Sequence, residues 1–476
     1  MQIVRSFGLA ASIIAAGSAT LPAQVAARTG SDSASVAEAR ALLKALVETN
    51  TTHEHGSTAP ATRLLADRFI QAGWPQADVE IVGPSPTRQN LVVRWRAPSP
   101  SAKPVLFMSH LDVVEAKRED WDSDPFVLRE KDGYLYGRGV LDDKAAVATW
   151  TTGLISLRRA GWRPSRDIVL LLTADEEGGE QNGVEWLVRN RRALFDVDFV
   201  INADAAGPEL HDGKVTLFAV DVAEKSPVTI DFTVTNPGGH SSLPRTDNAI
   251  YSLAHALIRI ERYRFPVQLS ELQRAQLTSS IETAPADVAN AVRAVLRDPN
   301  DSVASDALVR VPHLNGMLRT TCVPTMLSGG HAVNALPQRA TATVNCRILP
   351  GVDPQTVVAQ LLQVVADTAV HAEARPPTKP PAAASPMRED VLKLLTRAVA
   401  ASWGTSVRVQ PTMSRGATDG SYTRVAGIPT YTVWHVPLDP TDMRAHGKDE
   451  RILVKSFDES VAFARNLIRE AAGRTP

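Results

Sequence analysis

The sequence predicts an α/β protein with a mostly parallel central sheet and a smaller inserted α+β domain. Short apolar runs alternate with helical patterns up to residue 221, as in layered proteins built on parallel sheets. Between residues 222 and 385 the pattern becomes β-α-β-β-α-β, the ferredoxin-like order. From Met387 a helix and a strand continue the first pattern. The larger domain is therefore predicted to comprise residues 28–221 and 386–476.

Charge and composition are those of an ordinary globular protein of two or three domains. The 476 residues include 51 basic and 52 acidic side chains, and 44% of all residues are hydrophobic. There is no basic stripe and no Gly-rich phosphate loop. These features predict no binding to nucleic acid.

The N-terminus has the pattern of a secretory signal peptide. Arg5 precedes an apolar run from Phe7 to Leu21, and small residues follow, with a cleavage site near Ala27. The run is shorter than the roughly 20 residues that span a bilayer. We expect residues 1–27 to be removed and the protein to be periplasmic or secreted, with no membrane span. A membrane anchor or a misassigned start is the alternative.

The elements of the larger domain follow from hydrophobic periodicity. Four β-rich runs each end near polar residues, and they occupy residues 90–97, 103–112, 166–177 and 197–204. Helical patterns cover residues 35–50, 143–161, 182–194 and 388–404, and one more strand is expected over 429–436.

The inserted domain is predicted from a similar pattern. Strands are expected over residues 226–236, 320–330 and 340–350, and helices over 248–263 and 353–370. Residues 373–386 are Pro-rich and are expected to form a last strand and an exit linker. Residues 264–312 form a long insertion with poor periodicity.

The chain has two cysteines, Cys322 and Cys346, in runs that resemble two strands of one pair. In an oxidising compartment a cross-strand disulfide is geometrically allowed. Two buried free thiols are the alternative, and the sequence leaves both open.

Residues able to bind metal recur where strands end. They lie in five segments, and most of these follow a β-rich run. Because ligands of open α/β sheets bind beyond the carboxyl ends of the strands, these segments are expected to meet there. The residues are His110, Asp112, Asp142, Glu176, Glu177, Asp204 and His446.

Together with a few further motifs, this set resembles the M20 family of di-zinc peptidases and amidohydrolases. The motifs are His110-Leu-Asp112, Gly137-Arg-Gly-x-x-Asp142-Asp-Lys144, Glu176-Glu177, Asp204, Gly238-Gly-His240-Ser, Asn334-x-x-Pro337 with Arg347, and His446. The resemblance implies a zinc-peptidase-like α/β catalytic domain and an inserted lid or dimerisation domain. It extends over the whole chain after the predicted signal peptide.

The resemblance also implies a ligand set. Asp142 would bridge two Zn²⁺ ions, with Co²⁺ or Mn²⁺ as alternatives. His110 and Asp204 would complete one site. Glu177 and His446 would complete the other. Three carboxylates and a bridging hydroxide would balance the four positive charges, and the Asp142–Asp143 peptide bond would be cis.

The remaining catalytic roles are implied in the same way. Glu176 would be the general base, and Asp112 would orient the ring of His110. His240 would stabilise the tetrahedral oxyanion, and in many family members this histidine reaches into the partner's site of a homodimer. Asp175 matches no functional position of the family and is interpreted as a turn or cap residue.

The resemblance points the inserted domain towards the substrate. Asn334 and Arg347 would bind a carboxylate, for which the planar guanidinium is suited, and Gly416 and Thr418 lie in a loop that often contacts substrate. The expected substrates are peptides or N-acyl amino acids with a free C-terminus, as for carboxypeptidase S-like and secreted N-acyl amino acid hydrolases. An aminopeptidase is the main alternative. A non-catalytic metal-binding protein is weaker, as is a serine hydrolase, because no G-x-S-x-G motif is present.

Overall fold

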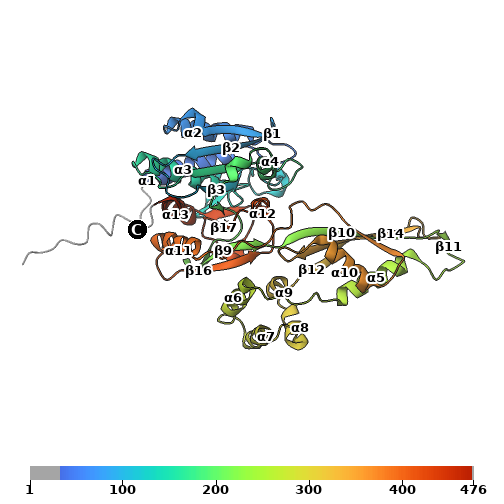
Figure 1. The fold of residues 1–476 in the computed structure, drawn as a ribbon. Helices are drawn as coiled ribbons and strands as arrows, with labels where there is room; N and C mark the ends of the chain where they lie inside the picture. Colours follow the sequence, from blue (N-terminus) through green and yellow to red (C-terminus); the bar gives the residue numbers. More distant parts are fainter. Residues whose placement is uncertain (1–32, 474–476) are drawn as a thin grey trace, which may run out of the picture. The chain divides into compact units, whose positions relative to one another are not determined.

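The computed structural model describes residues 33–473 (Figure 1). The predicted signal peptide, residues 1–27, lies outside the described residues. Within residues 33–473, no helix combines the length and the apolar character that crossing a bilayer requires.

A nine-stranded sheet forms the centre of the larger domain. Its strands are β1 (Val79–Ser85), β2 (Arg88–Trp95), β3 (Val105–His110), β6 (Ile168–Thr173), β7 (Phe199–Asn202), β8 (Pro208–His211), β9 (Lys214–Glu224), β16 (Arg408–Ser414) and β17 (Thr430–Thr432). Their order is β1-β2-β6-β3-β7-β17-β9-β16, and β8 pairs with β9. The four central strands β6, β3, β7 and β17 are parallel, as are β9 and β16. The predicted mostly parallel sheet is confirmed, with antiparallel pairs towards its edges.

Helices cover both faces of this sheet. They are α1 (Ser33–Val47), α2 (Ala59–Gln71), α3 (Lys144–Arg159), α4 (Gly183–Asn190), α11 (Glu389–Trp403), α12 (Gly420–Val425) and α13 (Val454–Ala472). Alternate residues of β3 pack against the helices on opposite faces of the sheet, because successive side chains of a strand point to opposite sides. Phe107 packs in the core that contains α3 and α13, whereas Leu106 and Met108 pack in the core that contains α4 and α12.

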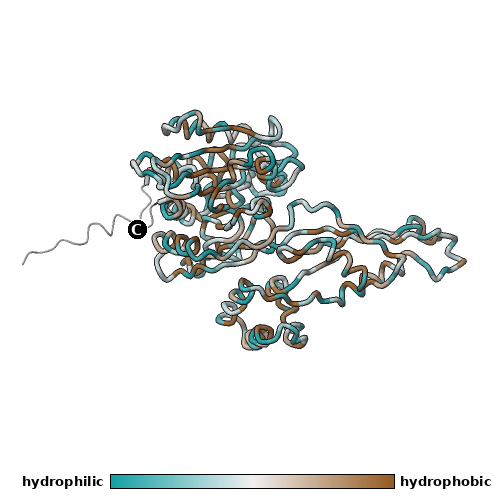
Figure 2. Tube along the Cα trace, in the orientation of Figure 1, coloured by the Kyte–Doolittle hydropathy of each residue, from teal (hydrophilic) through white to brown (hydrophobic). Residues whose placement is uncertain are grey.

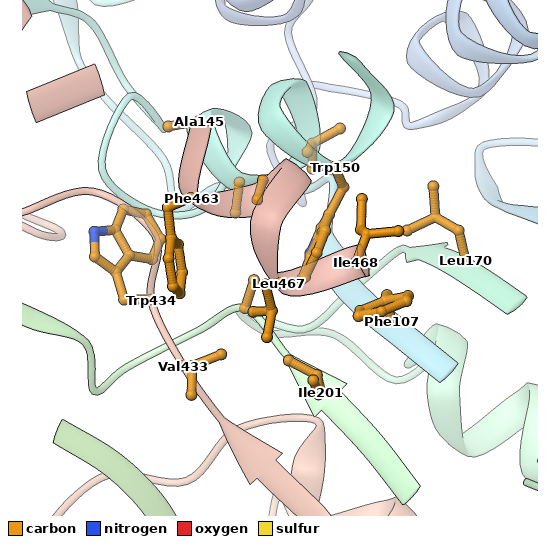
Figure 3. Close-up of a cluster of buried hydrophobic side chains, with 14 of the residues drawn as sticks. Phe107, Ala145, Trp150, Leu170, Ile201, Val433, Trp434, Phe463, Leu467 and Ile468 are labelled. Atoms are coloured by element: carbon orange, nitrogen blue, oxygen red, sulfur yellow. The ribbon is translucent and has the colours of Figure 1, made fainter. Parts of the chain in front are cut away.

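The core beneath α3 and α13 is rich in aromatic side chains. Figure 3 shows Phe107 and Ile201 on the sheet facing Trp150 of α3 and Ile468 of α13. The rings of Phe107 and Trp150 have centroids 4.6 Å apart. Figure 2 shows that much of the trace in these central strands is hydrophobic. The polar residues that follow these strands are therefore positioned by a closely packed hydrophobic core.

The inserted domain has its own four-stranded antiparallel sheet and its own core. Its elements are β10 (Ser226–Thr235), α5 (Ala249–Arg262), β12 (Thr321–Gly329), β14 (Arg339–Ile348), α10 (Pro354–Val365) and β15 (Val370–Ala374). The order along the chain is β-α-β-β-α-β, with strands arranged β12-β14-β10-β15. Strand β9 stays in the larger sheet as far as Glu224, a little beyond the predicted boundary at residue 221.

The insertion between α5 and β12 contains four short helices that periodicity did not predict. They are α6 (Glu271–Ser280), α7 (Ala286–Arg297), α8 (Ser302–Val309) and α9 (Pro312–Leu318). They share a small core that includes Leu277, Val292 and Leu308. Each helix spans only two or three turns, so each offers few repeats of an apolar stripe. A local signal was present, because Ser270 and Gln273 form a capping box at the start of α6.

The two cysteines form a disulfide. Cys322 of β12 and Cys346 of β14 lie directly opposite each other in the strand register. The register of the two strands therefore decides between the two alternatives that the sequence left open.

Two smaller sheets complete the fold. A three-stranded sheet lies beside the larger domain, and a two-stranded ribbon extends from the inserted domain. Their strands are β4 (Arg129–Lys131), β5 (Tyr134–Tyr136) and β18 (Arg451–Leu453), and β11 (Gly239–His240) and β13 (Ala335–Leu336).

Candidate metal centre

The polar residues that follow the parallel strands meet at one edge of the sheet. His110 is the last residue of β3, Glu176 and Glu177 follow β6, and Asp204 follows β7. Because β6, β3 and β7 are parallel neighbours, their carboxyl ends lie side by side. Asp142 joins them from the segment just before α3, and the peptide bond that follows it is cis.

Two groups of possible ligands form at this edge. In the first, ligand atoms of His110, Asp142 and Glu177 all lie within 4.8 Å of one another. In the second, the same distance joins His110, Glu176 and Asp204. The two groups share His110, whereas the predicted sites share Asp142; the second group contains Glu176, the predicted base, and neither group includes His446.

Asp142 lies between the two predicted histidine ligands. His110 Nε2 is 2.8 Å from one carboxylate oxygen of Asp142, and His446 Nε2 is 3.2 Å from the other. His446 Nε2 is also 2.9 Å from Glu177 Oε2. Each oxygen of the Asp142 carboxylate thus faces a different imidazole. This is the arrangement expected of a carboxylate that bridges two metal ions.

The electrostatics of the cluster favour divalent cations. Burial and the charge of Asp142 raise the pKa of Glu177, and burial and the charge of Glu176 raise the pKa of Asp204 well above its usual range. Hydrogen bonds to Asp142 and Glu177 raise the pKa of His446 to about 10. Closely spaced buried carboxylates need positive charge nearby. Imidazole and carboxylate donors suit Zn²⁺, so the residues present fit the expected metal.

Asp112 supports the site in two ways. Its carboxylate oxygens accept hydrogen bonds from the backbone N–H groups of Glu176 and Glu177, at 3.1 and 3.0 Å. Its backbone oxygen lies 3.0 Å from His110 Nδ1, whereas its carboxylate is 3.8 Å from that atom. The contact that orients the ring therefore comes from the backbone of Asp112, and the side chain holds the loop that carries the two glutamates.

Comparison with known proteins identifies the family. Residues 106–470 of the chain match the family described as peptidase family M20/M25/M40. The match covers more than half of the chain. The chain belongs to this family. It is accordingly a metallohydrolase that acts on peptide or amide bonds.

Individual relatives agree with this assignment. The human N-fatty-acyl-amino acid synthase/hydrolase is 30% identical to this chain over 386 residues. The alignment covers 78% of this chain and 75% of the relative. A probable carboxypeptidase S-like protein of Dictyostelium discoideum is 28% identical over 387 residues, covering 80% and 74%. An M20 family metallo-carboxypeptidase from Sulfolobus solfataricus has the same fold, with a TM-score of 0.66, 18% identity and coverage of 91% and 98%.

Asp175, the first of three consecutive carboxylates in this M20 chain, has a buried partner that the sequence did not indicate. Its Oδ1 lies 2.7 Å from Arg88 Nε, and the two side chains are 1% and 10% exposed. Its backbone has φ of 56°, a left-handed turn conformation. Arg88 lies in β2, far away in sequence, so no local pattern could have paired the two.

A buried ion pair links the two loops that carry Asp142 and His446. Arg138 Nη1 is 2.6 Å from Glu450 Oε2. The Glu450 carboxylate accepts hydrogen bonds from three backbone N–H groups of the Asp142 loop, including that of Asp142 itself at 3.1 Å. Arg138 Nη2 in turn donates to the carbonyl oxygen of Gly447 at 3.1 Å. Arg138 lies within the Gly-Arg-Gly motif, but the role of Glu450 was not predicted.

Lys379 is a further site residue that the sequence did not reveal. It lies in the Pro-rich linker after β15, and its ammonium contacts the Glu176 carboxylate and donates to the carbonyl oxygen of Ala417 at 3.1 Å. Burial opposes its charge, but the negative charges of Glu176 and Asp419 outweigh burial and raise the pKa of Lys379. A single lysine in a Pro-rich segment matches no sequence motif, so there was no reason to expect Lys379 at the site from the sequence.

The predicted substrate residues of the inserted domain lie at its two ends. Arg347 is near the end where β10 begins, and its Nη1 donates to the carbonyl oxygen of Arg415 at 3.5 Å. His240 and Asn334 lie in the β11–β13 ribbon beyond the other end of β10 and β14 (Figure 1). There the side chain of His240 is exposed and its Nδ1 is 2.8 Å from Ser242 Oγ. The four-stranded sheet therefore separates His240 from Arg347.

The two loop residues predicted to contact substrate differ in environment. Gly416 donates its N–H to Ser414 Oγ at 3.1 Å and lies beside a cavity. Thr418 is buried, and its hydroxyl donates to Glu224 Oε1 at 2.6 Å. Glu224 also pairs with Arg424, at 2.7 Å. The side chain of Thr418 thus anchors the loop, whereas Gly416 faces open space.

Proposed function

We propose that this M20 chain is an exported di-zinc hydrolase that cleaves the amide bond before a C-terminal amino acid with a free carboxylate. The convergence of His110 and four carboxylates at one sheet edge, with His446 in contact with two of them, is the observation that carries this proposal. The names of two relatives, one an N-fatty-acyl-amino acid hydrolase and one carboxypeptidase S-like, support substrates of this kind.

The metal sites are proposed from the contacts described above. Asp142 would bridge the two ions, His110 and Asp204 would complete one site, and Glu177 and His446 the other. When bound, two Zn²⁺ ions would acidify a shared water and polarise the substrate carbonyl. Co²⁺ or Mn²⁺ could take the same donors.

Glu176 is proposed to move the proton. Its side chain is buried beside the metal ligands, and its backbone is held by Asp112. It would take a proton from the attacking water as the new C–O bond forms, and pass it to the nitrogen as the C–N bond breaks. His240 would donate a hydrogen bond to the oxyanion between these two steps.

Arg347 is proposed to hold the terminal carboxylate. It stands at the end of the inserted sheet that leads into the larger domain, next to the loop of Gly416. A guanidinium can bind a carboxylate through two parallel hydrogen bonds. Asn334 would assist from the β11–β13 ribbon of a second copy, which makes a homodimer through the inserted domain part of the proposal.

Export is proposed from the signal-like residues 1–27. The disulfide between Cys322 and Cys346 supports an oxidising compartment. N-terminal sequencing of the protein recovered outside the cytoplasm should find a start near residues 26–28, and a start at Met1 would contradict the proposed export.

A paired hydrolysis assay tests the proposed function. Zinc-loaded mature protein is given N-acyl amino acids and short peptides, each as the free acid and as the C-terminal amide. Cleavage of the free acids alone is expected. Glu176→Ala should abolish it, while Glu180→Ala, which alters an exposed carboxylate of the same loop, should not. Equal cleavage of the amides would contradict the carboxylate clamp and favour an aminopeptidase.

A further inference from the structure

The proposed base, Glu176, lies close enough to the proposed metal ligands to be a ligand itself. Ligand atoms of His110, Glu176 and Asp204 all lie within 4.8 Å of one another. Carboxylate oxygens are ordinary ligands of Zn²⁺. A general base, however, needs a free carboxylate that can take a proton from the attacking water. Distance alone therefore does not separate the base from the ligands.

The partner of Glu176 differs in kind from the partner of two proposed ligand carboxylates. Asp142 and Glu177 both face the imidazole of His446, and a neutral imidazole can itself bind a metal. Within residues 33–473, Lys379 is the only cationic side chain paired with the Glu176 carboxylate. An ammonium group has three donors and no lone pair, so a metal ion cannot be bound by both members of this pair.

Lys379 is fixed at its charged end by two contacts. Its ammonium contacts Glu176 Oε1 and donates to the carbonyl oxygen of Ala417 at 3.1 Å. The side chains of Lys379 and Glu176 are only 12% and 7% exposed. Hydrogen bonds between charged groups are stronger than those between neutral groups, and burial strengthens them further. The pair therefore holds one oxygen of Glu176 in a defined position.

The linker that carries Lys379 is itself held in place. Prolines occupy positions 376, 377, 380 and 381, and each restricts the backbone because its ring fixes φ. The Tyr422 hydroxyl donates to the carbonyl oxygen of Thr378 at 3.1 Å. On the other side, the N–H of Arg375 donates to the carbonyl oxygen of Thr229 in β10 at 2.8 Å. A short restrained segment between the two domains thus places the ammonium at the base.

We propose that Lys379 is a positioning residue that keeps the Glu176 carboxylate off the metal and so leaves it free to act as the base. The inference rests on the proposed function, because it takes His110 and Asp204 as metal ligands. Without the ammonium, Glu176 joins these two residues as an additional ligand. A carboxylate bound to a metal ion is a weaker acceptor for the proton of the attacking water. The linker after β15 thus contributes to the reaction without touching the substrate.

Metal coordination is the first readout, because it does not depend on turnover. Lys379→Met keeps a long side chain and removes the charge. In crystals of the zinc-loaded proteins, a Glu176 oxygen should lie about 2.0–2.2 Å from zinc in this variant and make no bond to zinc in the parent. Lys379→Arg keeps the positive charge and should resemble the parent. Glu176 bound to zinc in the parent, or free of zinc in Lys379→Met, would overturn the inference.

Zinc affinity measures the same change in solution. Competition with a chromophoric chelator should show about tenfold tighter binding in Lys379→Met than in the parent. Removing a positive charge near the metals also favours binding, so the comparison is repeated in the Glu176→Ala background, where this side chain cannot coordinate. The gain in affinity from Lys379→Met should be smaller there, by about threefold or more. Equal gains in the two backgrounds would contradict coordination by Glu176.

Kinetics separate the inference from the proposed function. Loss of the free base should lower kcat by about 100-fold or more in Lys379→Met and leave KM nearly unchanged. Lys379→Arg should recover much of kcat, and Lys393→Met, which alters an exposed lysine of α11, should match the parent. A normal kcat in Lys379→Met would overturn the inference. If the parent cleaves no free-acid substrate, the proposed function fails, and the coordination readout alone decides whether Lys379 holds Glu176 off the metal.

Discussion

The consecutive carboxylates Asp175, Glu176 and Glu177 have three different partners. Asp175 is buried against Arg88, Glu176 contacts Lys379, and Glu177 lies 2.9 Å from His446. Adjacent buried carboxylates are tolerated only when each meets positive charge or hydrogen-bond donors. The first is part of a buried ion pair, and the other two are the proposed general base and a proposed metal ligand.

Removing the charge of Asp175 should destabilise the fold. Asp175→Asn would leave the Arg88 guanidinium buried without its counter-charge, and the expected loss is about 3 kcal/mol in the free energy of unfolding. Urea unfolding measures it, with Glu180→Gln in the same loop as the exposed control. A loss no larger than that of the control would show that the pair contributes little.

His435 should make stability fall at acid pH. It is fully buried, and burial lowers its pKa to about 3, whereas in the unfolded chain the pKa is near 6.5. Between these values the unfolded state binds the proton and the folded state does not, so stability decreases as pH falls. By pH 5 this residue accounts for about 2 kcal/mol of lost stability.

The prediction is checked by comparison with His435→Gln. Urea unfolding at pH 8 and pH 5 should show that the variant loses about 2 kcal/mol less than the parent over this interval. The effect of the substitution itself is present at both pH values and cancels. Equal losses in the two proteins would contradict a neutral buried His435.

At the scale of the elements, the segment before α3 and the loop before β18 are joined by hydrogen bonds and an ion pair. The Glu450 carboxylate accepts the backbone N–H groups of Leu141 and Asp142, and Arg138 pairs with Glu450. The proposed metal ligands Asp142 and His446 come from these two segments. Their relative position thus depends on one buried ion pair that touches neither ligand side chain.

Glu450→Gln should therefore weaken metal binding. The neutral amide removes the counter-charge of Arg138 and places an N–H₂ group towards backbone N–H donors. Outer partners of this kind typically change metal affinity by about 10–100-fold. Competition with a chromophoric chelator measures zinc affinity, and Glu389→Gln on the exposed face of α11 is the control. Unchanged affinity in Glu450→Gln would show that the two loops are held independently.

In the whole molecule, the length of the inserted sheet separates the two proposed substrate groups. Arg347 pairs with Pro227 and Arg339 with Thr235, and eight residues of strand span about 27 Å. His240 lies beyond the Arg339 end. This separation supports the proposal that His240 acts in the site of a second copy.

Mixing two inactive variants tests this arrangement. Co-expressed Glu176→Ala and His240→Ala chains would form heterodimers with one intact site, and random pairing should restore about a quarter of the wild-type activity. Glu176→Ala with Glu177→Ala is the control, because every site then lacks one residue. A heterodimer identified by mass that stays inactive would contradict action of His240 in the partner's site.

Motifs and periodicity predicted the parts of the molecule that depend on local sequence. The helix over 143–161 and the strand over 103–112 are present as α3 and β3. Local patterns failed for α6 to α9, whose few turns pack on one another. They also failed for Lys379 and Glu450, because contacts between residues far apart in sequence leave no periodic signal.

By itself the sequence determined the fold class, the family resemblance and the residues able to bind metal, because strand periodicity and the spacing of His, Asp and Glu are properties of neighbouring residues. Only the tertiary structure decided which charges neutralise one another, that Cys322 meets Cys346, and that the exit linker brings Lys379 to Glu176. These depend on strand register and domain packing, which bring distant segments into contact.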